Sequence, residues 1–86
     1  MTKSFSYGQL EDALRALGFQ KHDVQGSHCY FTHPTSDIVL TYPPYTRSTL
    51  ALERHVVATR HFLDEYGYLD QNEFESFVRN LGKVVS

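Results

Sequence analysis

The sequence predicts an α+β domain of two layers, in which helices cover one face of a three-stranded antiparallel sheet. Two patterns lead to this fold class: apolar side chains recur at helical spacing near both ends of the chain, and they alternate at strand spacing in three short segments between. Short turn-like connections between those segments favour a meander, so the predicted order is αβββα plus an extra C-terminal helix.

The length and charge of the chain limit what it can be. With 86 residues, 41% of them hydrophobic, we predict a single domain over 1–86, with a core at about 7–66 and an acidic helical extension at about 67–82. The formal net charge of −2 argues against a strong binder of polyanions. The N-terminal segment lacks the apolar run of a signal peptide or membrane span, and Cys29 is a single cysteine, so we expect a cytoplasmic protein.

The first helix is predicted at Tyr7–Leu17. Ser6 and Gln9 have the spacing of a capping box, and Gly18 suits the left-handed position that ends a helix. Four apolar residues form its buried stripe: Leu10, Ala13, Leu14 and Leu17.

Three strands are predicted next. They are Phe19–Val24, His28–His33 and Ile38–Tyr42, separated by turns at Gln25-Gly26 and Pro34–Asp37. A two-residue turn at Gln25-Gly26 would pair Asp23 with His28 and Lys21 with Tyr30.

This register decides which side chains face the helices, and a longer loop or a bulge at Gly26 would change it. The face predicted to lie toward the helices carries Gln20, His22, Val24, Ser27, Cys29 and Phe31. The face predicted to lie toward solvent carries Lys21, Asp23, His28, Tyr30 and Thr32.

Two further helices complete the prediction. A long one is predicted from Ser48, with Gly67 as its C-cap and a stripe of Leu52, Val56, Thr59, Leu63 and Tyr66. Asp70 and Glu73 then have capping-box spacing for a last helix that carries Phe74, Phe77, Val78 and Leu81.

His28 is the leading candidate for chemistry. An imidazole can accept or give a proton near neutral pH, and the carboxylate of Asp23 could fix its tautomer. The alternative is an ordinary surface histidine.

The sequence offers two other candidate sites. A zinc site at His28, Cys29 and His33 is disfavoured, because neighbouring strand residues point to opposite faces and no metal-ligand spacing occurs. A surface for single-stranded nucleic acid could instead combine aromatic and cationic side chains, namely Tyr30, Tyr42 and Tyr45 with Lys21, Arg47 and His33.

Two motifs, LRALGF at the end of the first helix and GSHCYFTHP at the second strand, make the chain recognisable. With the two motifs in this order, the chain resembles the HicA-type toxins, which are small mRNA interferases of toxin-antitoxin pairs. The resemblance covers about Leu10–Leu63. The resemblance implies a fold like a double-stranded-RNA-binding domain, RNA cleavage that needs no metal or cofactor, and His28 as the catalytic residue.

The predicted supporting or substrate-binding positions around His28 are Gly26, Ser27, Asp23, Lys21, Tyr30, His33 and Arg47. Of these, Ser27 or the nearby backbone could bind the phosphate in the activity that the resemblance implies. The partners that the resemblance implies are mRNA and a HicB-like antitoxin, with no membrane. A second acid or base is missing from this account, and His33, Tyr30 or the substrate itself are the alternatives.

The chain departs from the family in two respects. Typical members are shorter and basic, whereas here only Lys21 and Arg47 lie near the hairpin and an acidic segment follows. That segment could pack on the core, form a homodimer or shield the site. The rival hypothesis is therefore a non-catalytic module of the same fold that binds RNA or protein.

Overall fold

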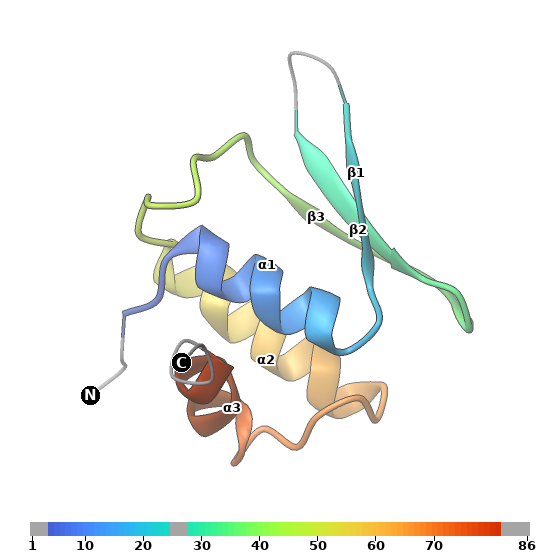
Figure 1. The fold of residues 1–86 in the computed structure, drawn as a ribbon. Coiled ribbons are helices and arrows are strands. Elements are labelled where there is room, and N and C mark those ends of the chain that lie inside the picture. Colours follow the sequence, from blue (N-terminus) through green and yellow to red (C-terminus); the bar gives the residue numbers. More distant parts are fainter. Residues whose placement is uncertain (1–3, 25–27, 82–86) are drawn as a thin grey trace.

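The computed structural model describes residues 4–24 and 28–81 and confirms the predicted α+β class. The helices are α1 (Tyr7–Ala16), α2 (Glu53–Glu65) and α3 (Phe74–Leu81), and the strands are β1 (Gln20–Asp23), β2 (Cys29–His33) and β3 (Ser36–Tyr42). The three strands form one antiparallel sheet in the order β1-β2-β3. Figure 1 shows α1 and α2 side by side against one face of this sheet, with α3 farther from it.

Helix α1 begins and ends at the predicted signals. The backbone N–H of Gln9 donates to Oγ of Ser6 at 3.1 Å, and the Ser6 N–H donates to Oε1 of Gln9 at 2.8 Å. At the other end Gly18 has a φ of 99°, a left-handed conformation that favours glycine. The capping box is thus complete, and the chain turns directly into β1.

The hairpin register differs by one residue from the predicted one. Asp23 lies opposite Cys29 and His22 opposite Tyr30, and the Val24 N–H donates to the His28 carbonyl at 3.1 Å. Three residues, 25–27, therefore separate the paired positions, where the prediction placed two. The predicted pairing of Asp23 with His28 is wrong.

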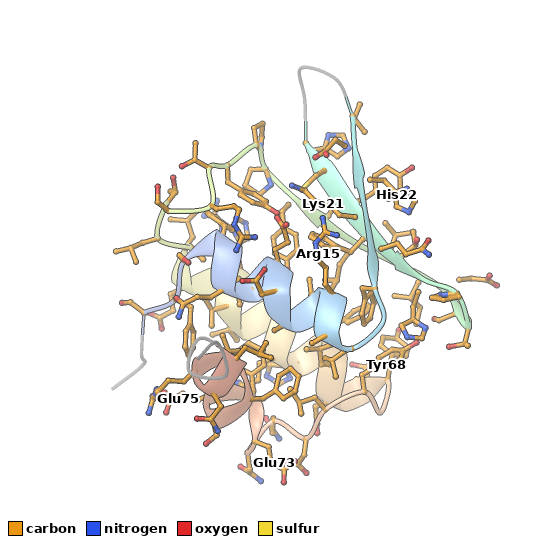
Figure 2. All side chains as sticks on the ribbon, in the orientation of Figure 1. Arg15, Lys21, His22, Tyr68, Glu73 and Glu75 are labelled. Carbon is orange, nitrogen blue, oxygen red and sulfur yellow. The ribbon has the colours of Figure 1, made fainter. Side chains whose placement is uncertain are left out.

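The shift reverses the faces of β1 and leaves those of β2 unchanged. Cys29 and Phe31 point toward the helices as predicted, with 4% and 0% of their surface exposed. Lys21 shares their face instead of facing solvent, and His22 lies on the opposite face. Figure 2 shows Lys21 and His22 on opposite sides of the strand.

Helix α2 begins at Glu53, five residues later than predicted from Ser48. The preceding segment instead forms hydrogen bonds with the start of the chain. Carbonyls of Arg47 and Thr49 accept from the N–H groups of Gly8 and Tyr7, at 3.0 and 2.9 Å. These are first-turn donors of α1 that have no partner within the helix, so the tertiary contact outweighs the local helical pattern.

The acidic extension is part of the hydrophobic core. Phe74 and Val78 of α3 are 2% and 1% exposed, and the Phe74 ring meets Phe5 edge to face at 6.2 Å. Helix α3 packs on α1, on the side away from the sheet (Figure 1). Of the roles considered for the extension, packing on the core is the one that this arrangement supports.

The last helix begins at Phe74, after a turn rather than directly after the predicted cap. Oδ1 of Asp70 accepts from the Asn72 N–H at 2.7 Å, so Asp70 stabilises that turn. Across residues 4–24 and 28–81, no helix combines the length and apolar character required to span a bilayer.

Candidate functional site

The sheet face opposite the helices carries the side chains available for binding. By strand pairing and alternation it contains His22 of β1, Tyr30 and Thr32 of β2, and Val39 and Thr41 of β3. We call this set the outer face. Val39 is 51% exposed, which is consistent with a face that lies opposite α1 and α2.

His22 is held in a fixed orientation on the outer face. Its ring stacks on Tyr30, with ring centres 4.8 Å apart and planes 17° apart. Its Nε2 forms a hydrogen bond with Oγ1 of Thr32 at 2.8 Å. The predicted register places His22 toward the helices, which is why His22 is absent from the predicted site residues.

His28 lies immediately before β2 and is exposed. The hydrogen bond from Val24 extends the ladder to His28, and alternation from Tyr30 places His28 on the same side of the sheet as the outer face. The exposed, outward position predicted for His28 is therefore found. Its predicted companions Gly26 and Ser27 lie outside the described residues.

Lys21 is directed away from His28, toward α1. Its Nζ lies 3.2 Å from Oε1 of Glu11, 3.5 Å from Oδ1 of Asp23 and 5.0 Å from the centre of the Tyr45 ring. Burial lowers the pKa of Lys21, but the hydrogen bond and charge of Glu11 outweigh it and leave the pKa raised. Lys21 and Asp23 thus pair with each other, on the helix-covered side.

Arg47 is also paired with acidic groups. Its guanidinium lies 2.8 Å from Oδ2 of Asp12 and 3.2 Å from Oε2 of Glu11. The hydrogen bond that the guanidinium donates to Asp12 is the main cause of a raised Arg47 pKa. The structure brings Arg47 together with Lys21 around Glu11 and does not bring either cation to the outer face.

His33 lies at the opposite end of β2 from His28. The Thr35 N–H donates to its Nδ1 at 3.2 Å, so Nδ1 is an acceptor and Nε2 carries the proton donated to the Leu17 carbonyl at 3.1 Å. A Cβ at Gly18 would lie 2.9 Å from Nε2, which explains a glycine at that position. His33 therefore joins the end of α1 to the sheet.

The aromatic nucleic-acid surface considered from the sequence is not formed. Tyr42 is only 4% exposed, and its hydroxyl forms a hydrogen bond with Oγ1 of Thr59 in α2. Tyr45 donates from its hydroxyl to Oε1 of Glu11 at 2.8 Å. Tyr42 lies on the helix side because it pairs with the inward-facing Cys29 of β2, and Tyr45 stacks on Tyr7 of α1 with ring centres 4.8 Å apart.

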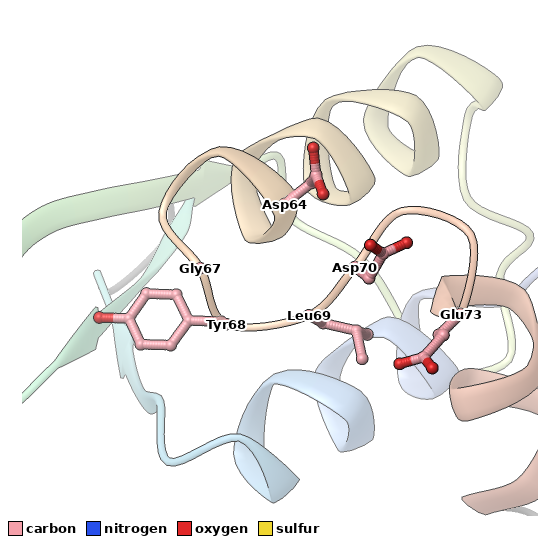
Figure 3. Close-up of a pocket in the computed structure, with 6 residues that line it drawn as sticks. All are labelled: Asp64, Gly67, Tyr68, Leu69, Asp70 and Glu73. Carbon is pink, nitrogen blue, oxygen red and sulfur yellow. The ribbon is translucent and has the colours of Figure 1, made fainter.

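A shallow depression of about 380 Å³ lies between α2 and α3 (Figure 3). It is lined by Asp64, Gly67, Tyr68, Leu69, Asp70 and Glu73. Oδ1 of Asp64 accepts from the Gln71 N–H at 3.2 Å, so this carboxylate, like that of Asp70, stabilises the loop. The described part of the chain holds no group of three or more His, Cys, Asp or Glu side chains arranged to bind a metal ion.

Comparison with known proteins identifies the family. A family model described as the HicA toxin of bacterial toxin-antitoxin matches residues 7–52, a span that contains α1 and the whole sheet. Comparisons with curated proteins and with solved structures gave no match. Because the family match covers more than half of the chain and includes the hairpin that carries His28, the chain belongs to the HicA toxin family of bacterial toxin-antitoxin systems.

Proposed function

We propose that this toxin cleaves mRNA and that His28 transfers a proton in the reaction. The observation that carries the proposal is the position of His28, exposed on the side of the sheet opposite α1 and α2. A long RNA can approach this side without any movement of α1 or α2.

The chemistry fits a single strand of RNA. Attack of a 2′-hydroxyl on the adjacent phosphorus releases the 5′-oxygen of the next nucleotide. One proton must leave the 2′-oxygen and one must reach the departing oxygen. An imidazole can accept or give a proton near neutral pH, so it can serve either transfer.

We propose a HicB-like antitoxin as the protein partner, because membership in a toxin-antitoxin family implies an antitoxin. An antitoxin that covers the outer face would block access to His28. This arrangement predicts that bound antitoxin protects the hairpin and leaves α3 exposed, which hydrogen exchange of the complex would measure.

The test compares two histidine variants. His28→Ala should abolish RNA cleavage by the purified protein and relieve growth arrest on expression. His61→Ala removes an exposed histidine of α2 and should cleave like the wild type. Equal cleavage by the His28 variant would show that His28 is not the catalytic group.

A non-catalytic binding module is the second candidate, and the pairing of Lys21 and Arg47 with Glu11 and Asp12 favours it. Cations already bound to carboxylates contribute less to phosphate attraction. In this case the wild type would leave RNA intact, and growth arrest would not depend on His28.

A further inference from the structure

We propose that His22 is the second proton-transfer group of the same reaction, so that His22 and His28 divide the two proton transfers between them. This inference rests on the proposed RNA cleavage. His22 would be the second acid or base, the role for which His33, Tyr30 and the substrate are the alternatives indicated by the sequence.

The hairpin register brings the two histidines to one side of the sheet. His22 lies opposite Tyr30, and His28 is two residues before Tyr30 on the neighbouring strand. Residues in this diagonal relation are typically about 7–8 Å apart. With a hydrogen bond of roughly 2.6–3.2 Å at each end, one phosphodiester can reach both imidazoles.

The surroundings of His22 favour a functional role over a purely structural one. Tyr30 supports one face of the ring and Thr32 engages Nε2, so the orientation of the ring is set while Nδ1 has no hydrogen bond among those described. A ring held in place by its neighbours loses little freedom when substrate binds.

The alternatives named from the sequence fit this role less well. Both nitrogens of His33 are engaged by Leu17 and Thr35. His33 is also five residues from His28 along the strand, which corresponds to roughly 16 Å. Tyr30 serves as the ring on which His22 stacks.

The two transfers balance without any further reactant. A neutral imidazole takes the proton from the 2′-hydroxyl as the 2′-oxygen forms its bond to phosphorus. A protonated imidazole gives its proton to the 5′-oxygen as the bond from phosphorus to that oxygen breaks. The products are a 2′,3′-cyclic phosphate and a free 5′-hydroxyl, and the two histidines have exchanged protonation states.

The experiment uses the full-length protein and an RNA oligonucleotide with one scissile linkage. In a matched substrate the 5′-bridging oxygen of that linkage is replaced by sulfur. A thiolate leaves without being protonated, so this substrate does not need the general acid. The variants are His22→Gln, whose amide can still pair with Thr32, and His28→Gln, with His61→Gln as the control.

On the ordinary substrate, each of the two site variants should lose about 10²–10⁴-fold in rate, whereas the control cleaves like the wild type. On the sulfur substrate, the rate should recover for one site variant and not for the other. The variant that recovers identifies the general acid, and the other identifies the general base.

Several outcomes would overturn the inference. Wild-type rates for His22→Gln, with His28→Gln inactive, would remove His22 from the chemistry and leave the proposed function intact. If the sulfur substrate restored the rate of both variants, or of neither, the two proton transfers would not be divided between His22 and His28. A wild type that cleaves neither substrate would overturn the proposed function and this inference together.

Discussion

The carboxylate of Glu11 and the ammonium of Lys21 lie 3.2 Å apart and join α1 to β1 beneath the sheet. The Glu11 side chain is 7% exposed, and its two oxygens also interact with Arg15, Arg47 and Tyr45. A buried carboxylate is costly unless its oxygens are paired, and here each oxygen has at least two partners. Glu11 therefore links the first helix to the sheet and to the loop before α2.

Replacing Glu11 by Gln should destabilise the fold by about 2 kcal/mol, because Lys21 and Arg47 lose a shared partner in a mostly buried position. Asp12→Asn is the matched control, since Asp12 and Arg47 are 50% and 56% exposed and such a pair contributes under about 1 kcal/mol. Urea unfolding measures both variants. If both variants lost the same free energy of unfolding, the burial of Glu11 would add nothing to its contribution to stability.

Glu11 should also make stability depend on pH in the acid range. Burial raises the pKa of Glu11, but hydrogen bonds from Tyr45 and Lys21 outweigh it and leave the pKa below the ordinary 4.5. The unfolded chain then takes up a proton at higher pH than the folded one. The free energy of unfolding should fall as the pH drops below about 4.5, and it should fall less in Glu11→Gln. Parallel curves for the two proteins would contradict this expectation.

His55 should make the free energy of unfolding depend on pH nearer neutrality as well. Burial, assisted by the charge of Arg54, lowers its pKa below the ordinary 6.5, and Nδ1 lies 2.7 Å from the Tyr7 hydroxyl. Below pH 6.5 the unfolded state binds the proton more readily, so stability should fall as the pH drops through this range. His55→Gln should reduce that fall. Thermal unfolding between pH 7.5 and 5.5 would reveal the difference.

Truncating Phe74 tests whether the C-terminal extension belongs to the domain core. Phe74 is 2% exposed and meets Phe5 at 6.2 Å, so Phe74→Ala should cost about 3–5 kcal/mol. Tyr66→Ala is the control, because Tyr66 is 48% exposed and should cost much less. A Phe74 variant as stable as wild type would mean that α3 is dispensable for folding.

Local sequence patterns were sufficient to predict features that depend on residues of one helix or one strand. Ser6, Gln9 and Gly18 set the ends of α1 as predicted, because capping involves only residues within one turn. The same holds for the inward direction of Cys29 and Phe31, which follows from alternation along one strand. The division of the chain into a core at 7–66 and an extension stays a prediction.

The prediction was wrong where the structure depends on contacts between residues far apart in the chain. The pattern before Glu53 favoured helix, but the backbone at Arg47 and Thr49 caps α1 instead. The two-residue turn predicted at Gln25-Gly26 placed Lys21 toward solvent, yet its partner Glu11 lies on another element on the covered side.

The sequence by itself determined the order of the elements, the family resemblance and the candidacy of His28, because each depends on residues close together in the chain. Only the tertiary structure decided the hairpin register, and with it the neighbours of His28. A shift of one residue exchanges the two faces of a strand. It placed Lys21 and Asp23 on the helix-covered side and His22 beside Tyr30, on the side of the sheet where His28 is exposed.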